Sequence, residues 1–353
     1  MSSPILSILV ITHNQRELLK RCLDSVLGQK QNVPFEVIVS DDRSDDGTAE
    51  YIGELQVQIQ SGQKKIENLQ ELVYTRCNSN ECQPTNVSER CGWNKLNAWR
   101  HAQGKYMVNI DADDYLLHDD IYQLQIDALE GHPECSMCQQ HVWIVNDGEP
   151  IERGHVSYLP PIVKDGAVVS MEKVLKYGLR GLNQSYMMRR YPNDDMAALY
   201  GKHYDDTVIT YHHLQNGPVV FIDRADYVWV QYPKSISHDM TNDDQLVTYG
   251  LLPLHHAELF PQKCTLFVRT GLNELIALFK QAPQYPKLSK QYIDFLKQFK
   301  GFVFTYYTEN QHSSYHRVKH KFILWYMLLL NKLKWTNDCW YAILYRLLKN
   351  QMI

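Results

Sequence analysis

The chain opens with two apolar runs separated by an amphipathic stretch. Residues 5–11 and 35–40 are rich in Val, Ile and Leu and show little alternation with polar residues. Continuous runs of this kind are typical of strands that are covered on both faces in a parallel sheet. Between them, apolar residues recur at helical spacing over residues 18–27, and we expect Asn14 and Glu17 to cap that helix. The order strand, helix, strand predicts an α/β fold.

A third apolar run, residues 106–110, ends in an acidic cluster. Asp111, Asp113 and Asp114 follow it directly. Clustered carboxylates repel one another and are costly to desolvate unless a cation or a ring of donors offsets the charge. Hard cations such as Mg²⁺ and Mn²⁺ prefer carboxylate oxygens and leave positions open for phosphate oxygens. The cluster predicts a metal site for a nucleotide diphosphate, although a capped turn after a strand produces the same pattern.

Polar residues also end the first two runs. Thr12, His13 and Asn14 follow the first run, and Asp41 and Asp42 follow the second. In open parallel sheets, ligands bind beyond the carboxyl ends of the strands. Core packing gives no reason for polar clusters at three equivalent positions, whereas a nucleotide site needs donors, acceptors and a metal there. We therefore expect the three clusters to meet in one site.

These three motifs, in this order, resemble the family-2 glycosyltransferases, nucleotide-sugar-dependent enzymes of the GT-A fold, over roughly the first 240 residues. The resemblance implies a Rossmann-like mixed sheet flanked by helices. It implies inverting transfer of a sugar from a nucleotide-diphosphate donor, expected to be a UDP-sugar, to a hydroxyl of a glycan or lipid-linked oligosaccharide. It also implies Mn²⁺ or Mg²⁺ as cofactor.

By the same resemblance, individual residues take roles in donor binding. Thr12 and Asn14 would line the nucleotide pocket, and Asp41 or Asp42 would accept a hydrogen bond from the base. The remaining expected donor-site residues are Asp111 near the ribose, Asp113 on the metal, and Asn97 in a helix expected over residues 92–104, with Asn94 as its alternative. The sequence fits equally well with Asn97 as an exposed helix residue that has no role in donor binding.

The sequence departs from the family pattern at two positions. His13 stands where a Tyr is usual, and Arg43 replaces a Gly. The loop after the second strand therefore lacks the conformational freedom of glycine at that point.

An inverting transferase also needs a general base for the acceptor hydroxyl. Asp205 and Asp206 resemble the family's acidic pair at the start of a helix, and Asp206 fits the base best. An ordinary helix cap is the alternative interpretation. Residues 194–195 form a competing acidic pair in a polar turn. Further on, the resemblance suggests that His238 completes the metal coordination or contacts the diphosphate, although imidazole is not a favoured ligand of Mg²⁺.

Charge is unevenly distributed along the 353 residues. Residues 263–353 carry 14 Lys and Arg against 4 Asp and Glu, whereas residues 1–262 carry 22 against 36. Two charge regimes indicate two environments. We expect a catalytic domain over residues 1–240 and a basic, aromatic-rich helical region over residues 241–353.

The basic region contains one long apolar run, residues 322–330. It is too short to span a bilayer, which needs about 20 residues. Its basic and aromatic flanks over residues 317–349 fit a helix lying in the lipid headgroup region, and they fit a buried helix of a C-terminal subdomain equally well. No nucleic-acid-binding motif accompanies the basic residues. The N-terminus shows no export signal, so we expect a cytoplasmic protein, with peripheral contact to the inner face of the membrane as the variant that the basic region allows.

Two alternatives to a glycosyltransferase remain open, and the cysteines raise the separate question of a zinc site. An acidic cluster after a strand also serves metal-dependent phosphohydrolases and nucleotidyltransferases, and a transferase scaffold can serve as a non-catalytic glycan-binding module. Cys77, Cys82 and Cys91, with the pair Cys135 and Cys138, lack the clean paired spacing of a zinc site. Reduced thiols are expected there.

Overall fold

The computed structural model describes residues 3–82, 87–157, 164–177, 185–191 and 206–232, together with His256, Leu259 and Phe260. The chain divides into two compact units, Met1–His238 and Asp239–Ile353. The numbered helices and strands all belong to the first unit. The assignment of separate roles to residues 1–240 and 241–353 stays a prediction, and residues 317–349 lie outside the described part.

The described elements alternate between strands and helices. The helices are α1 (Arg16–Leu27), α2 (Thr48–Gln60), α3 (Val87–His101), α4 (Ile121–Gly131), α5 (Met171–Tyr177) and α7 (Asp206–Asn216). The strands are β1 (Leu6–Thr12), β2 (Phe35–Asp41), β3 (Leu69–Arg76), β4 (Tyr106–Asp111), β5 (Tyr115–Leu116), β6 (Met137–Asn146), β7 (His155–Val156), β8 (Val168–Val169), β9 (Tyr186–Arg189) and β10 (Val219–Gln231).

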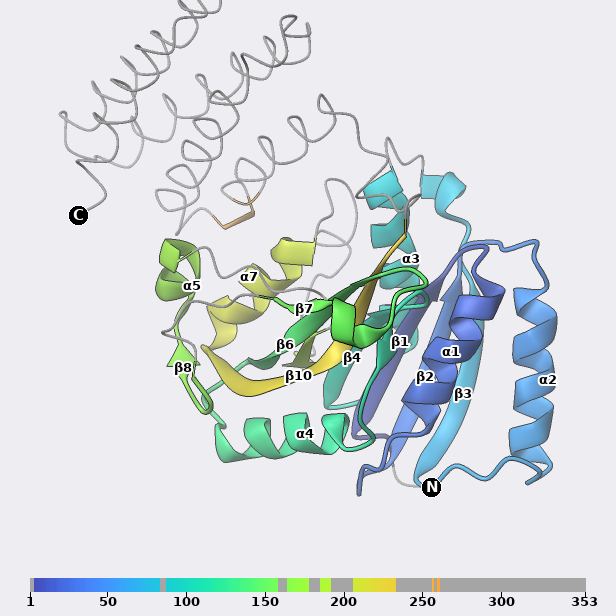
Figure 1. Cartoon of the computed structure of the whole chain (residues 1–353), viewed down its shortest axis with the longest axis horizontal. Coiled ribbons are helices and arrows are strands. Elements are labelled where there is room, and N and C mark those ends of the chain that lie inside the picture. The colour runs from blue at the N-terminus through green and yellow to red at the C-terminus, as the bar shows by residue number, and fades with distance from the viewer. Residues whose placement is uncertain are drawn as a thin grey trace, which may run out of the picture. The chain divides into compact units, whose positions relative to one another are not determined.

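The strands form one mixed sheet in the order β3-β2-β1-β4-β9-β6-β10-β5, with β7 beside β6 and β8 beside β10 (Figure 1). β1 pairs in parallel with β2 and β4, and β2 pairs in parallel with β3. β9 is antiparallel to both of its neighbours, β4 and β6. This confirms the predicted α/β fold with a mixed sheet.

The core lies where the continuous apolar runs predict it. All residues of β1 and β2 are buried, and α1 buries Leu19, Cys22, Leu23, Val26 and Leu27. Helix α3 packs against β1 and β2, and α4 packs against β6 and β10 (Figure 1). Each fully buried Val, Leu or Ile side chain stabilises the fold by about 1.5–3 kcal/mol. The strand ends that carry the candidate site are therefore held by a well-packed frame.

The predicted capping of α1 by Asn14 and Glu17 is wrong. Gln15 occupies the N-cap position and makes no side-chain capping hydrogen bond. Asn14 has a left-handed backbone, with φ +52°, and its Oδ1 accepts the Asp45 N–H at 2.9 Å. The Arg16 N–H donates to Asp46 Oδ2 at 2.8 Å, so a carboxylate from the loop after β2 satisfies the start of this helix.

Within the described residues, no helix has both the length and the apolar character that crossing a membrane requires.

Gly104 lies where the segment before β4 meets the backbone of β1. A Cβ at this position would lie 2.6 Å from the Ser7 nitrogen and 2.8 Å from the Leu6 carbonyl carbon. We expect Gly104→Ala to lower the free energy of unfolding by about 1–3 kcal/mol, because the backbone itself must shift. Gly53→Ala, in α2, is the matched control, since nothing lies within 4 Å of its Cβ. That change should raise stability by about 0.5–1 kcal/mol. Urea unfolding of both variants checks this, and equal effects would contradict it.

Candidate active site

The register of the sheet brings the three polar clusters together at the carboxyl ends of β1, β2 and β4. Thr12 lies beside Asp41 in the pairing of β1 with β2, and Ile11 lies beside Asp111 in the pairing of β1 with β4. The hydroxyl of Thr12 is buried, and among the described residues it has no hydrogen-bond partner. The carboxyl ends of three adjacent strands therefore form one polar surface.

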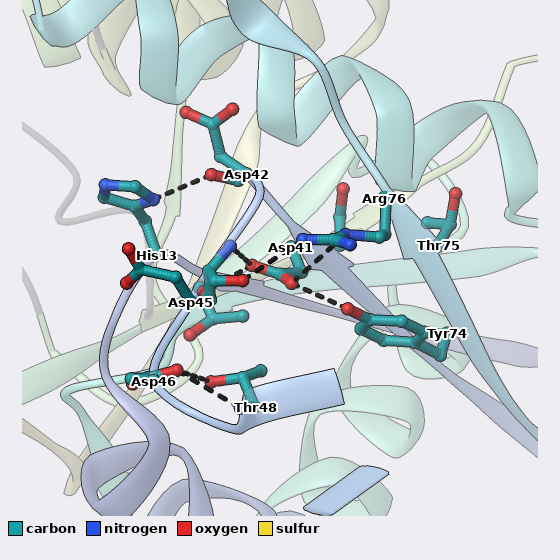
Figure 2. Close-up of polar contacts among 12 residues, drawn as sticks. His13, Asp41, Asp42, Asp45, Asp46, Thr48, Tyr74, Thr75 and Arg76 are labelled. Atoms are coloured by element: carbon teal, nitrogen blue, oxygen red, sulfur yellow. Dashed lines mark hydrogen bonds and ion pairs between the residues drawn. The ribbon is translucent and has the colours of Figure 1, made fainter. Parts of the chain in front are cut away.

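Asp41 is fully buried, and its carboxylate binds the turn that follows β2 and two residues of β3 (Figure 2). Oδ1 accepts from the Ser44 N–H at 2.9 Å and from the Ser44 hydroxyl at 2.5 Å. Oδ2 accepts from the Tyr74 hydroxyl at 2.7 Å and lies 3.9 Å from Arg76 Nε. Burial, reinforced by this hydrogen bond, raises the pKa of the Tyr74 phenol. These contacts indicate that Asp41 shapes the loop.

Asp42 points away from Asp41 (Figure 2). Its Oδ2 accepts from Arg90 Nη2 of α3 at 2.7 Å. Of the two alternatives for recognising the nucleotide base, Asp42 is thus the one whose carboxylate is not part of the turn.

The loops after β1 and β2 are tied together by polar contacts. His13 Nδ1 donates to the Asp42 carbonyl oxygen at 2.7 Å (Figure 2), and the Asn14 N–H donates to Ser44 Oγ at 2.8 Å. Arg43 has φ +59°, so it adopts the left-handed backbone although the glycine of the family pattern is missing. Its Nη1 donates to Asn78 Oδ1 at 2.6 Å. A left-handed backbone costs a non-glycine residue about 1–2 kcal/mol, so these contacts hold a strained loop.

The three carboxylates after β4 have different environments. Asp114 is 1% exposed, and its Oδ1 accepts the Val230 N–H at 3.0 Å. Burial and its acidic neighbours raise the pKa of Asp114 well above its usual range. The Asp111 side chain is 32% exposed. Burial and the nearby Asp111 raise the pKa of Asp113 to about 6.

Arg21 of α1 fixes the turn that carries Asp113. Its Nη2 donates to the Asp113 carbonyl oxygen at 2.7 Å and to the Tyr232 hydroxyl at 3.0 Å. Its guanidinium also lies over the Tyr115 ring, 4.6 Å from the centroid.

A lysine that sequence reasoning missed joins two predicted site residues. The Nζ of Lys95 lies 3.3 Å from Asp111 Oδ1 and 3.4 Å from Asp206 Oδ1. Asp206 is the first residue of α7, as predicted, and its side chain is 43% exposed. The available signal was helical spacing: Cys91, Ala98 and Ala102 form an apolar stripe that Lys95 interrupts.

The two asparagines of α3 contact the sheet. Asn97 Nδ2 donates to Ser40 Oγ at 2.8 Å and to Thr75 Oγ1 at 3.2 Å. Asn94 is buried, and its Nδ2 lies 3.2 Å from the carbonyl oxygens of Thr12 and Ser40. These contacts give both residues a structural role, and donor binding by Asn97 stays a prediction. The helix itself begins earlier than the expected residue 92.

Other expected site residues lie outside the described part of the chain. These are Asp205, His238 and the competing pair at residues 194–195. The described cysteines are free thiols. Within the described ranges, His132, Glu134 and Cys135 form the one group with metal-ligand spacing. Burial and Glu134 raise the pKa of Cys135 to about 11, which disfavours the thiolate that a zinc ion needs.

Comparisons with known proteins agree with this geometry. Residues 7–71 match the family described as Glycosyl transferase family 2. Two relatives are the uncharacterized proteins Mb1547 of Mycobacterium bovis and Rv1520 of Mycobacterium tuberculosis, each 24% identical over 241 residues. The alignment covers 67% of this chain and 62% of each relative, so it spans less than two thirds of their length.

Solved structures show the same fold. TarS residues 1–349 from S. aureus, in complex with UDP-GlcNAc, matches with a TM-score of 0.58 and 17% identity, over 84% of this chain and 81% of that one. The complex of the same protein with UDP matches with a TM-score of 0.55 and 17% identity, over 84% and 80%. The predicted GT-A fold is confirmed.

The raised pKa of Asp113 makes stability depend on pH. Because the folded pKa of about 6 exceeds the ordinary value of 3.8, the folded chain holds a proton that the unfolded chain releases. This contribution to stability is full below about pH 4 and is lost as the pH rises through about 6. Each pKa unit corresponds to about 1.4 kcal/mol. Without metal, Asp113→Asn should therefore raise the free energy of unfolding at pH 7 by about 2 kcal/mol and change it little at pH 4.

Urea unfolding in EDTA at both pH values measures this difference. Asp24→Asn is the control, because the Asp24 carboxylate is 69% exposed in an ion pair with Lys64. A gain at pH 7 of the same size in both variants would contradict the assignment.

Proposed function

We propose that this chain, which belongs to the family-2 glycosyltransferases and has their GT-A fold, transfers a sugar from a nucleotide-diphosphate donor to an acceptor hydroxyl with inversion at the anomeric carbon. The observation that supports this most directly is the meeting of β1, β2 and β4 at one polar edge, with Asp206 of α7 and Asp111 of β4 on either side of Lys95. The proposed donor-site residue Asp111 and the proposed base Asp206 thus both contact the same lysine.

A divalent cation, Mn²⁺ or Mg²⁺, fits the acidic turn. Asp113 is the residue proposed to hold it, with His238 as a further candidate and Asp111 beside it on the side of the ribose. The raised pKa of Asp113 indicates a carboxylate whose ionised form is poorly compensated by the protein alone, and carboxylate oxygens suit both ions. When bound, such an ion offsets the negative charge of the leaving diphosphate.

Donor recognition is assigned to the edge formed by β1 and β2. Thr12 offers a buried hydroxyl without a described partner, Asn14 and Asp42 lie in the loops that follow the two strands, and Asp111 would approach the ribose. We propose a UDP-sugar as donor, because TarS, which has the same fold, is solved with UDP and with UDP-GlcNAc.

The proton transfer is assigned to Asp206, with Asp205 beside it in sequence. Asp206 accepts the proton of the acceptor hydroxyl as that oxygen bonds to the anomeric carbon. The bond between this carbon and the diphosphate oxygen breaks on the opposite side, and its electron pair leaves with the nucleoside diphosphate. The attack from the opposite face inverts the anomeric configuration.

The acceptor is proposed to be a glycan or a lipid-linked oligosaccharide. Residues 241–353, with 317–349 as a peripheral membrane contact, would serve acceptor binding at the inner face of the membrane. No role for nucleic acid is proposed.

A binding experiment tests the donor site. UDP, GDP and dTDP are titrated calorimetrically into the full chain with and without Mn²⁺. We expect one diphosphate, UDP, to bind in a Mn²⁺-dependent manner, and Asp113→Ala to weaken this binding at least about tenfold, since one lost charged ligand costs more than about 1.4 kcal/mol. Asp45→Ala, in the neighbouring loop, is the control for a lost carboxylate. Absence of Mn²⁺-dependent binding for every diphosphate would refute the proposal.

A second experiment separates binding from proton transfer. Asp206→Asn should bind UDP and Mn²⁺ within about tenfold of wild type, whereas release of UDP from UDP-sugars in the presence of glycan acceptors should fall by about 10²–10⁴-fold. Proton NMR of the product reports the anomeric configuration, and retention would contradict the assigned mechanism. Release of UMP and sugar 1-phosphate instead of UDP, at a rate that the acceptor does not change, would indicate a phosphohydrolase.

A further inference from the structure

We propose that Lys95 is a positioning residue that couples the metal side of the active site to the general base. This inference rests on the proposed function, because that function assigns Asp111 to the donor side and Asp206 to proton transfer.

The burial of Lys95 requires an explanation. Its side chain is 3% exposed, and a lysine is almost never buried so deeply unless its charge is paired. The ammonium lies 3.3 Å from Asp111 Oδ1 and 3.4 Å from Asp206 Oδ1. The side chains of these two partners are 32% and 43% exposed, so the ammonium pairs with groups that also face solvent. One buried cation therefore serves two carboxylates that remain accessible to ligands.

The position of this ammonium is fixed by the fold. Asn94, the preceding residue of α3, is hydrogen-bonded to the carbonyl oxygens of Thr12 and Ser40 at the ends of β1 and β2. Lys95 thus projects from a point that is tied to the sheet, toward one carboxylate on β4 and one on α7. The ion pairs connect α7 to the strand ends.

A shared cation makes the two carboxylates interdependent. Asp113, the proposed metal ligand, has both Asp111 and Lys95 as electrostatic neighbours. A divalent ion held there would repel the ammonium, which would then pair more strongly with Asp206. If Asp206 loses its charge, the ammonium pairs with Asp111 alone and opposes the metal. Donor binding and the placement of the base should therefore be thermodynamically coupled through Lys95.

A double-mutant cycle tests the coupling without needing the acceptor. UDP and GDP, each with Mn²⁺, are titrated into wild type, Asp206→Asn, Lys95→Met and the double variant. We expect Asp206→Asn to weaken Mn²⁺-dependent binding about 3- to 10-fold in the wild-type background and less than about 2-fold in the Lys95→Met background. Lys95→Arg should keep the coupling, because a guanidinium can pair with both carboxylates.

The controls separate this role from a structural one. Lys105 directly precedes β4 and forms an exposed ion pair with Glu130. Lys105→Met removes this pair, and it should leave the effect of Asp206→Asn on Mn²⁺-dependent binding unchanged. If Lys95→Met does not fold, as judged by its melting temperature, Lys95→Gln replaces it in the cycle. Equal effects of Asp206→Asn with and without the lysine would overturn the inference while the proposed function stands. Failure of wild type to bind either diphosphate with Mn²⁺ would overturn both.

Discussion

The structure of the site depends on how negative charge is accommodated where β1, β2 and β4 end. Burying a carboxylate is costly unless a donor, a cation or a proton compensates it. Asp41 accepts hydrogen bonds from Ser44 and Tyr74, Asp42 accepts from Arg90, and Asp114 accepts from the Val230 N–H. Lys95 serves Asp111 and Asp206. Asp113 keeps a raised pKa because burial and Asp111 outweigh its favourable contacts. Donors and cations thus compensate Asp41, Asp42 and Asp111, whereas burial raises the pKa of Asp113 and Asp114.

The loops at these strand ends also have unusual backbone geometry. Asn14 and Arg43 both have positive φ, and both lie in loops that hydrogen bonds tie together, including those from His13 to the Asp42 carbonyl oxygen and from Asn14 to Ser44. A strained conformation persists only where its surroundings over-determine it. The strands beneath these loops are fully buried. A rigid sheet can therefore present loops of a shape that their own sequence would not favour.

The fold was predictable from sequence, whereas the division of labour among the carboxylates was not. Continuous apolar runs report burial on both faces, and that property decides the sheet; residues 5–11 and 35–40 accordingly became β1 and β2. Partners, by contrast, come from distant segments. Nothing near Asp41 in sequence announces Tyr74, and nothing near Asp111 announces Lys95 or Asp206. The capping pair at Asn14 failed for the same reason, because a carboxylate from another loop took the position at Arg16. Local sequence patterns identify helices and strands. The partners that the tertiary structure brings together decide which polar side chains stay available to ligands.

The acidic turn is also joined to the far end of the sheet. Val230 donates to Asp114, and Tyr232 accepts from the same guanidinium that holds the Asp113 carbonyl oxygen. The end of β10 therefore contacts the turn that carries the proposed metal ligand. The Tyr232 side chain, just after β10, is held to that turn through Arg21. Asp114 is 1% exposed, and the hydrogen bond that it accepts from the Val230 N–H links the turn to β10. This hydrogen bond gives Asp114 a structural role and sets it apart from Asp111, whose side chain is 32% exposed.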